Sequence, residues 1–555
     1  MFIRASRSGG HTYLRLVESY RDEHGRTRHR QIAQLGRADK LSEQEVEGLV
    51  ASLRRLTGRQ APRSQGPSFE LAREVGGPWV LTELWKALGL DRALARALRS
   101  SQRQFDAEAL IRVMVINRLC DPDSKLGVLR WLESVVIPGV DTAAISHQQL
   151  LRAMDALEQR RERFQQSMGR LLRPLIDQEL SIVFYDLTTI RIHGEAELEG
   201  DLRRYGRSKE LAGPARQCVL GLIQTADGLP LDFEVFEGNT AEVRTLLPMF
   251  KRVLKRYPIR RVVLVADRGL LSMDNVGELE QLRLADGSTP EYILAVPAGR
   301  YSDFQKIITQ LVFDPEEPSV RETAMEERRL VVAHDPKAAA ECARRRRVKL
   351  EELIALGDRL AEKLDAQDGG RNERGRRASD RGAYTRFSRT VLEAHFSRFI
   401  QAELSAERFN FTVNEPAIAR AEELDGKLVL LTNVPDLSAE DVVSRYKALA
   451  DIERGFRVLK SEIEIAPVYH RLPERIRAHA AICFLALLLH RVMRMRLKAN
   501  EAPWSVERVL EGLRRIQLHQ VTVDERRLRG LTAMSPEQLQ IFDQLEVPRP
   551  DDRAL

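Results

Sequence analysis

Residues 181–189, SIVFYDLTT, give the strongest indication of the fold in this sequence. The first five residues of this stretch form the compact apolar pattern of a buried strand, which ends on the carboxylate of Asp186. The stretch RVVLVADRG, residues 261–269, repeats this arrangement with Asp267. Because α/β sheets present their ligands where strands end, both aspartates are expected at such a strand terminus.

The segments around these two strands predict a mixed sheet covered by helices. Residues 218–224 and 231–236 form a hairpin pattern across Asp227 and Gly228, and residues 292–296 form a further apolar strand. A helical pattern at residues 243–256 precedes the strand of Asp267, and another helical segment follows that strand. This order of strands and helices is typical of an α/β fold.

Two aspartates at neighbouring strand ends suit a hard divalent cation such as Mg²⁺. Such ions take carboxylate oxygens, waters and substrate phosphate oxygens as ligands. Either aspartate alone is more often a turn former or a helix cap. Together, Asp186 and Asp267 favour a metal site.

A third acidic residue, Glu453, lies in a segment with helical periodicity from residue 439 to residue 463. Tyr446, Glu453 and Lys460 recur every seven residues, so a continuous helix places them on one stripe. Four apolar residues form the adjoining, buried stripe: Leu449, Ile452, Phe456 and Leu459. Periodicity alone also fits an ordinary amphipathic helix.

The remaining segments differ in composition and in hydrophobic periodicity. Residues 12–17 and 28–35 are arginine-rich strand patterns, residues 42–56 are helical, and residues 58–67 form a linker pattern. Residues 69–176 are helical in pattern and fit either a DNA-reading domain or a helical scaffold. Residues 300–425 are charge-dense, and their run of four arginines, residues 344–347, fits either DNA-backbone contact or a solvated helix face.

These patterns predict six segments. They are an N-terminal β/α region with possible DNA contact at 1–66, a helical domain at 67–176, a first part of the α/β core with Asp186 and Asp267 at 177–299, an inserted charged domain at 300–425, a second part of the core with Glu453 at 426–520, and a C-terminal tail at 521–555.

Composition narrows the class of protein. The chain has 555 residues, 43% hydrophobic and 30% charged, which predicts several folded units rather than disorder. The net charge of +7 favours a polyanionic partner. The four cysteines have no paired spacing, so a zinc ribbon and a disulfide framework are excluded and each is expected to be buried. The N-terminus lacks a signal-peptide pattern and the longest apolar run, residues 480–489, is too short for a bilayer, so we expect a cytoplasmic protein with no membrane partner.

The motifs resemble those of a known family. Tyr446, Glu453 and Lys460, together with DLTT after the first strand and DRG after the second, resemble bacterial insertion-sequence transposases that have a ribonuclease H-like core and a Tyr-Arg-Glu-Lys signature. The following PVYH at 467–470, with Arg475 and His479, is also similar to the family. The arginine of the signature, expected three residues after the tyrosine, is Leu449 here; Arg457 is a substitute without motif support.

The resemblance implies a fold and an activity. The fold is a ribonuclease H-like mixed α/β catalytic core interrupted by an inserted domain. The activity is DNA cleavage and strand transfer at the ends of a mobile element, with Asp186, Asp267 and Glu453 as catalytic residues that bind two divalent cations, Mg²⁺ or Mn²⁺. Tyr446 and Lys460 would hold DNA phosphates. The implied partners are double-stranded DNA, as terminal inverted repeats and target, and a second copy of the chain in the active complex. The implied location is bacterial cytoplasm, associated with the nucleoid when DNA is bound.

Two other functions are compatible with much of this pattern. One is a metal-dependent nuclease of the same superfamily that cuts DNA without joining it. The other is a DNA-binding protein without catalytic activity, against which the intact Asp186, Asp267 and Glu453 argue.

Overall fold

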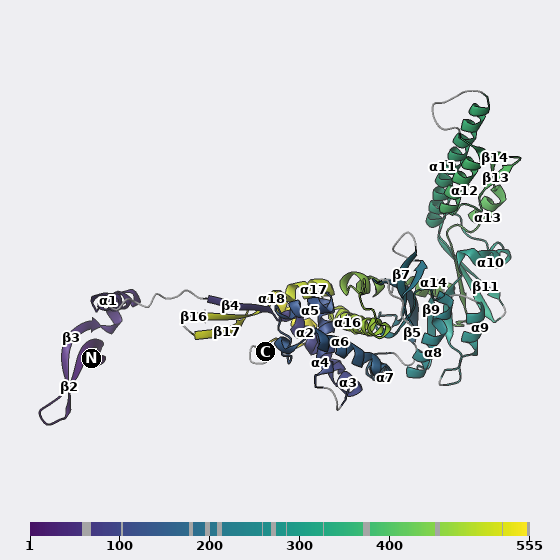
Figure 1. Ribbon diagram of the computed structural model, residues 1–555. Coiled ribbons are helices and arrows are strands. Elements are labelled where there is room, and N and C mark those ends of the chain that lie inside the picture. Colours follow the sequence, from purple (N-terminus) through teal and green to yellow (C-terminus); the bar gives the residue numbers. More distant parts are fainter. Residues whose placement is uncertain are drawn as a thin grey trace. The chain divides into compact units, whose positions relative to one another are not determined.

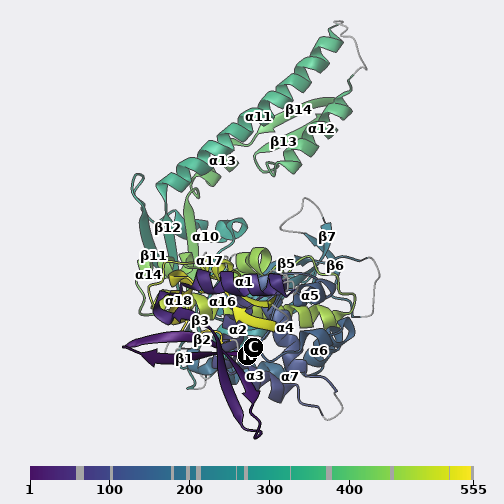
Figure 2. The same cartoon turned by 90° about the vertical axis from the view of Figure 1, so that its left-hand side faces the viewer.

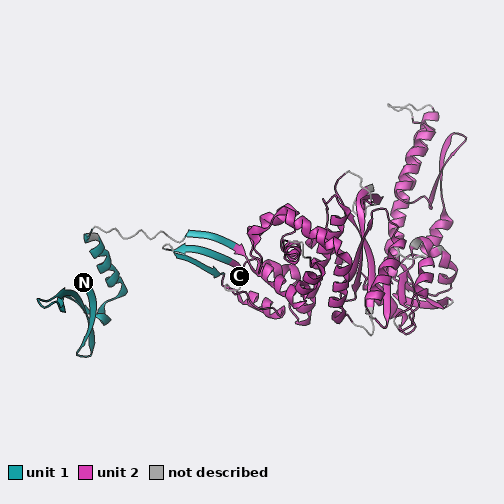
Figure 3. Ribbon diagram, turned by 60° about the horizontal axis from the view of Figure 1, so that its bottom comes forward, with its two compact units in different colours: residues 1–72, 518–531 teal, residues 73–517, 532–555 magenta. Residues whose placement is uncertain are grey.

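The computed structural model describes residues 1–57, 68–100, 104–176, 181–194, 200–207, 214–257, 259–267, 273–284, 286–325, 327–369, 378–449, 455–523 and 526–551 (Figure 1). The chain divides into two compact units, which Figure 3 shows in different colours. Unit 1 comprises Met1–Ala72 and Leu518–Leu531, and unit 2 comprises Arg73–Gln517 and Thr532–Leu555. The linker expected at residues 58–67 lies outside the described residues.

Unit 1 contains two three-stranded sheets. The first is followed by a helix, and its elements are β1 (Phe2–Ser8), β2 (His11–Arg21), β3 (Thr27–Arg37) and α1 (Glu43–Leu56). The strand patterns at residues 12–17 and 28–35 lie within β2 and β3, and the helical pattern at 42–56 agrees with α1 apart from its first residue. At the turn between β2 and β3, the Asp22 carboxylate accepts hydrogen bonds from the backbone N–H groups of His24 and Arg26, at 3.1 and 2.9 Å.

The second sheet of unit 1 joins segments that are far apart in the chain. Its strands are β4 (Ser68–Glu74), β16 (Gln517–Val523) and β17 (Arg526–Leu531), with β16 at the centre. The side-chain amide of Gln520 donates to the Glu70 carboxylate at 2.8 Å. Residues 69–74 were expected to be helical, and this expectation is wrong because a strand partner from the other end of the sequence pairs with them.

The first part of unit 2 is a helical layer. It contains α2 (Gly76–Ala87), α3 (Leu90–Ala97), α4 (Ala107–Cys120), α5 (Lys125–Leu132), α6 (His147–Gln159) and α7 (Arg161–Leu172). Helix α6 begins with a capping box in which Ser146 and Gln149 satisfy each other's backbone N–H groups. Two further helices follow near the C-terminus, α17 (Val506–Leu513) and α18 (Pro536–Gln544).

Helix α16 (Pro473–Ala499) joins the helical layer to the central sheet. It contacts α4 and α6 on one side and β8 (Pro230–Glu237) on the other. By length and composition this helix could cross a membrane, yet 94% of its apolar 18-residue stretch is buried inside the protein. This burial is typical of a central helix in a protein core.

The central sheet of unit 2 is mixed and has nine strands among the described residues. In spatial order these are β11 (Ser319–Met325), β12 (Arg328–His334), β15 (Lys427–Thr432), β10 (Glu291–Ala295), β9 (Val262–Ala266), β5 (Ser181–Arg191), β7 (Pro214–Thr225) and β6 (Arg204–Arg207), with β8 also paired to β7. The pairs β5·β9 and β9·β10 are parallel, and the other pairs are antiparallel. The expected mixed α/β sheet is confirmed.

Helices cover both faces of this sheet. Helix α14 (Ala439–Lys447) contributes Val442 and Val443 to an apolar cluster with Phe184, Val263 and Val265 of β5 and β9. Helix α8 (Leu246–Arg256) lies against the opposite face. Two shorter helices complete this part, α9 (Met273–Gln281) and α10 (Tyr301–Ile308).

An inserted subdomain lies between β12 and β15. Its elements are α11 (Pro336–Asp368), α12 (Asp380–Glu393), β13 (Ile400–Ser405), β14 (Arg408–Val413) and α13 (Glu415–Glu422), and Figure 2 shows them side by side. They enclose an apolar core of their own around Leu353, Phe387 and Phe409. At Gly357 an added Cβ would lie 2.4 Å from the Phe411 ring, so glycine permits this close packing of α11 on β14. Residues 370–377, between α11 and α12, lie outside the described residues.

Three of the four consecutive arginines in α11 have carboxylate partners. Arg344 and Arg345 both donate to Glu341, at 2.8 and 2.5 Å. Arg346 donates to Asp425 at 3.0 Å, and only 9% of its side chain is exposed. The arginine run is therefore largely engaged in ion pairs within the inserted subdomain.

The cysteines are free thiols, as the sequence predicts. Cys120, Cys218 and Cys483 are buried, whereas Cys342 on α11 is exposed. The expectation of burial is therefore wrong for Cys342, whose side chain on α11 is exposed to solvent.

Candidate active site

Asp186 and Asp267 lie on neighbouring parallel strands. The last residue pair between β5 and β9 is Tyr185 opposite Ala266, and each aspartate is the next residue along its chain. Because paired strands are about 4.8 Å apart, the two acids start from adjacent backbone positions. Asp267 follows the end of β9 as expected, but Asp186 lies in the middle of β5. Strand β5 continues to Arg191 because β7 pairs with it beyond the point where β9 ends.

Both acids belong to the face of the sheet that α14 covers. Side chains alternate along a strand, so Asp186 shares its face with Phe184, and Asp267 shares its face with Val265. Phe184 and Val265 are buried in the apolar cluster under α14. The cluster therefore fixes the direction in which both carboxylates point.

Hydrogen bonds orient the two carboxylates. The Tyr446 hydroxyl of α14 donates to Asp267 Oδ1 at 2.8 Å, and the backbone N–H of Leu187 donates to Asp186 Oδ1 at 2.7 Å. Both acids are half-buried. A tyrosine hydroxyl carries one hydrogen, so while it donates to Asp267 it cannot donate to a phosphate. In this structure Tyr446 therefore orients the Asp267 carboxylate.

The opposite face of the sheet is fixed by buried polar contacts that the sequence interpretation did not identify. Arg252 and Arg256 of α8 donate to the Asp232 carboxylate of β8 at 2.9 and 3.0 Å. Tyr185, next to Asp186, is fully buried against this layer, and burial raises the pKa of its hydroxyl well above the ordinary value. The signal in the sequence was an aspartate inside an apolar strand, followed by two arginines one helical turn apart.

The comparison with protein families decides the identity. A model of the transposase DDE domain matches residues 177–489, which include both aspartates, the inserted subdomain and the segment from Tyr446 to Lys460. The chain belongs to the DDE transposases. A second model, the N-terminal domain of IS1634 family transposases, matches residues 3–65 of this transposase.

Among solved structures, the transposase is similar to the piggyBac transposase in a cryo-EM structure of its synaptic complex with hairpin DNA. The TM-score is 0.39 at 7% sequence identity, over 79% of this chain and 77% of that chain. The comparison with curated proteins gave no match.

The third acid predicted for this transposase, Glu453, lies outside the described residues, as do Ile452 and the Arg268 and Gly269 of the DRG motif. The described chain on both sides of Glu453 lies on the acid-bearing face. Tyr446 precedes it and bonds Asp267, and Gly455 follows it beside Gln224 of β7. An added Cβ on Gly455 would lie 2.9 Å from the Gln224 amide, and Gln224 is paired with Phe184 on β5.

The helix predicted at residues 439–463 is not one regular α-helix in its described parts. Helix α14 ends at Lys447, and the N–H of Leu449 bonds the carbonyl of Tyr446 in a tighter turn. Val458–Glu462 is a π-helical turn, in which the N–H of Ile463 bonds the carbonyl of Val458. The seven-residue stripe assumes uniform 3.6-residue turns, which neither the end of α14 nor the π-helical turn has.

The structure also describes Lys460, Leu449 and Arg457, the remaining positions considered for the signature. Lys460 is half-buried in the π-helical turn, and Arg457 beside it is exposed. Leu449 is 7% exposed and belongs to the cluster under α14, so an arginine at this position would have to be desolvated in apolar surroundings. Phe456 and Leu459 of the predicted apolar stripe are also buried.

The donor set fits a hard divalent ion. Both described acids supply only carboxylate oxygens, which Mg²⁺ and Mn²⁺ prefer. Within the described ranges no group of three or more His, Cys, Asp or Glu side chains could hold a metal ion. The third predicted ligand, Glu453, is not among the described residues. DDE transposases use divalent metal ions.

Proposed function

We propose that this transposase cleaves DNA strands at the ends of an insertion sequence and joins them to target DNA, with Asp186, Asp267 and Glu453 as the catalytic residues and the ligands of two Mg²⁺ or Mn²⁺ ions. The observation that carries the proposal is the pairing of Tyr185 with Ala266, which sets the two aspartates on neighbouring strands. The positions of Tyr446 and Gly455 on the same face support the inclusion of Glu453.

The strand order supports a ribonuclease H-like core. The order β8, β7, β5, β9, β10 has three successive antiparallel strands followed by two strands that add in parallel next to β5. The first strand in the sequence is then central, and its face carries the first acid. This arrangement agrees with the fold that the sequence resemblance implies.

The residues divide the chemistry between them. Two divalent ions, when bound by the three acids, activate the attacking oxygen and stabilise the departing oxygen of an in-line displacement. Tyr446 and the N–H of Leu187 hold the Asp267 and Asp186 carboxylates in fixed orientations before metal binding. Lys460 is proposed to hold a DNA phosphate, which positions the strand without reading its sequence.

The proposed partners follow from the reaction. Double-stranded DNA enters as the terminal inverted repeats of the element and as the target. Because two ends must be joined to one target, we propose that the active complex is a homodimer.

A strand-transfer assay tests the proposed function. Purified full-length protein, Mg²⁺ and a linear fragment bearing the element's terminal repeats should yield joined products, and a fragment without the repeats is the matched control. Cleavage without joined products would instead identify a nuclease of the same superfamily. Binding of the repeats with neither cleavage nor joining in Mg²⁺ or Mn²⁺ would contradict catalysis altogether.

A further inference from the structure

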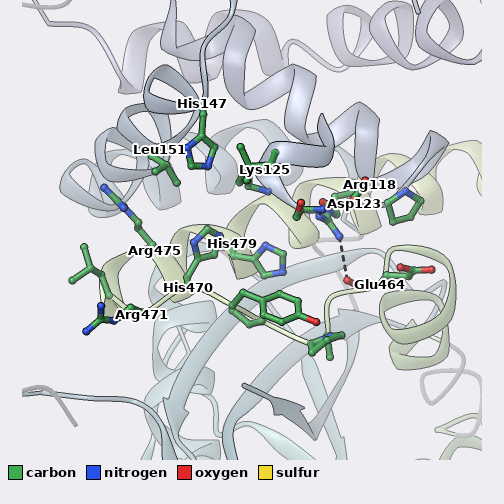
Figure 4. A pocket seen from close by; sticks show the side chains of 18 residues that line it. Arg118, Asp123, Lys125, His147, Leu151, Glu464, His470, Arg471, Arg475 and His479 are labelled. Carbon is green, nitrogen blue, oxygen red and sulfur yellow. Dashed lines mark hydrogen bonds between the residues drawn. The ribbon is translucent and has the colours of Figure 1, made fainter. Parts of the chain in front are cut away.

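A cavity of about 700 Å³ lies within unit 2, apart from the catalytic aspartates (Figure 4). One wall is formed by the helical layer and carries Arg118, Lys125 and His147. The opposite wall is formed by the chain that follows the π-helical turn and carries His470 and Arg475. Neither Asp186 nor Asp267 lines the cavity.

Lys125 is the most unusual of these residues. It is 5% exposed, and within the described residues no group accepts a hydrogen bond from its ammonium or forms an ion pair with it. Lys125 is also the first residue of α5, where the helix end carries partial positive charge and a cation is unfavourable. Burial of an ammonium at such a position is costly unless an anion accompanies it.

The neighbouring cation, Arg118, is not neutralised either. Its side chain donates to the carbonyl oxygens of Ile463, Glu464 and Asp123, at 3.4 and 3.2 Å for the first two. These carbonyl groups accept from the two terminal nitrogens of the guanidinium but supply no negative charge, and within the described residues its buried Nε has no hydrogen-bond partner. Arg118 is 5% exposed, so solvent compensates little of its charge.

The carboxylates near the cavity are engaged or exposed. The Asp123 carboxylate accepts from the Ser124 N–H at 2.6 Å and from Arg130 at 3.3 Å. Glu464 is exposed to solvent. Arg475 has its own partner, Asp155, at 2.8 Å, which leaves Lys125 and Arg118 as a surplus of positive charge.

The electrostatics of the cavity are consistent with a missing anion. Burial, and then the charge of Arg118, lowers the pKa of Lys125 to about 7. Burial, followed by the charges of Lys125 and Arg475, lowers the pKa of His470 to about 4. Both shifts express the cost of gathering cations where water is scarce, and an anion bound between them would reduce that cost.

The mouth of the cavity is open and carries a flat aromatic surface. Tyr469 and Leu126, which line the cavity, are 67% and 57% exposed. The His193 ring stacks on Tyr469 at 5.0 Å with an interplanar angle of 6°. A nucleotide can therefore place a phosphate inside and stack its base at the entrance.

We propose that this cavity binds a phosphate group, with Lys125 and His470 as its contacts, and that in the working transposase the phosphate belongs to DNA. The cavity is a second anion site that does not depend on the catalytic acids. Only the DNA source of the phosphate rests on the proposed function.

Sulfate, a tetrahedral anion of the same shape, tests the cavity without any DNA. Thermal unfolding of the full-length protein is followed as sulfate is added against chloride at equal ionic strength, for the parent, Lys125→Met, His470→Gln and the control Lys86→Met. Lys86 is an exposed residue of α2 paired with Glu83. We expect sulfate to raise the unfolding temperature of the parent and of Lys86→Met, and this rise to fall by at least about half in Lys125→Met and His470→Gln.

A separate readout distinguishes an anion site from a purely structural lysine. Without sulfate, Lys125→Met should unfold at a higher temperature than the parent at pH 7, because it removes a buried charge and keeps the apolar length. If the sulfate response is the same in the parent and in both cavity variants, the cavity is not an anion site. If Lys125→Met cannot be purified folded, the His470→Gln response alone decides.

Two oligonucleotide duplexes identify the source of the phosphate. They carry the element's terminal sequence with either a 5′-phosphate or a 5′-hydroxyl. A loss of affinity in Lys125→Met for the phosphorylated duplex alone assigns a terminal phosphate, and an equal loss for both, with a salt slope lower by about one, assigns a backbone phosphate. Unchanged affinity for both duplexes alongside a lost sulfate response would overturn the DNA source.

Discussion

Two regions of the protein gather side chains of like charge: the central sheet carries Asp186 and Asp267, and α11 carries four consecutive arginines. The hydrogen-bond partners of these side chains differ. Arg344 and Arg345 share the carboxylate of Glu341. Asp267 instead receives its hydrogen bond from the neutral hydroxyl of Tyr446. A neutral donor orients a carboxylate without cancelling its charge, so the acid keeps its attraction for cations. The partners of a charged group, rather than charge density along the sequence, therefore distinguish a carboxylate that can still attract a cation from a group held in a structural ion pair.

Removing one carboxylate of the site is expected to have the largest effect. Asp186→Asn, Asp267→Asn and Glu453→Gln should each lower DNA cleavage by at least about a thousandfold, equivalent to ~4 kcal/mol of transition-state stabilisation, while DNA binding stays near the parental level. Single-turnover cleavage and a binding assay on the same preparation measure both. Asp303→Asn is the matched control, because Asp303 is an exposed residue of α10 paired with Arg300. Cleavage at close to the parental rate in any of the three would remove that residue from the site.

Breaking the buried pair in the inserted subdomain should affect stability instead of chemistry. Arg346→Met leaves Asp425 without its partner, and the two side chains are only 9% and 13% exposed. We expect a loss of about 2 kcal/mol, less than for a fully buried pair because both groups keep some solvent contact. Hydrogen exchange in α11 and α13 would report it, and unchanged protection there would show that this pair contributes nothing measurable.

Removal of the Tyr446 hydroxyl distinguishes two roles for this group, orienting Asp267 and binding a DNA phosphate. If Tyr446 mainly orients Asp267, then Tyr446→Phe should lower the cleavage rate about tenfold, equivalent to ~1.4 kcal/mol, and leave DNA affinity unchanged. Rates at saturating DNA and equilibrium binding separate the two effects. A fall in affinity with an unchanged rate would return Tyr446 to a phosphate-binding role.

The smallest expected effects concern cations that bind DNA phosphates and cations that are already paired with a carboxylate. Lys460→Ala should lower the slope of log affinity against log salt by about one unit on all DNA sequences. The double variant of Arg344→Gln and Arg345→Gln should leave this slope unchanged, because these arginines already share Glu341. A reduced slope in the double variant would mean that the run contacts DNA after all and that the ion pairs open in the complex.

Much of the central sheet could be predicted from sequence because its strands are short apolar runs with clear ends. The position of Asp186 within its strand could not be predicted. Thr188 and Thr189 are polar in sequence, yet both are buried in β5 because β7 pairs along the whole strand. Strand length here depends on a partner and not on local hydrophobicity.

Other features depend on residues that are distant in the chain. The sheet of β4 and β16 joins both ends of the sequence, and the cavity brings Lys125 to His470. Periodicity is a local signal and contains no information about such pairs. It also assumes regular helical turns, so it predicts neither the end of α14 at Lys447 nor the π-helical turn at Val458–Glu462.

The ends of the inserted subdomain meet at one point. His334 of β12 is paired with Lys427 of β15, and the backbone N–H of Asp335 bonds the carbonyl of Gly426 at 3.0 Å. In topological terms, residues 336–425 are the loop of a β-hairpin enlarged to the size of a folded module. A two-residue turn could close the same hairpin, so this module can be exchanged between related chains, or deleted, without removing a strand from the sheet that carries the acids.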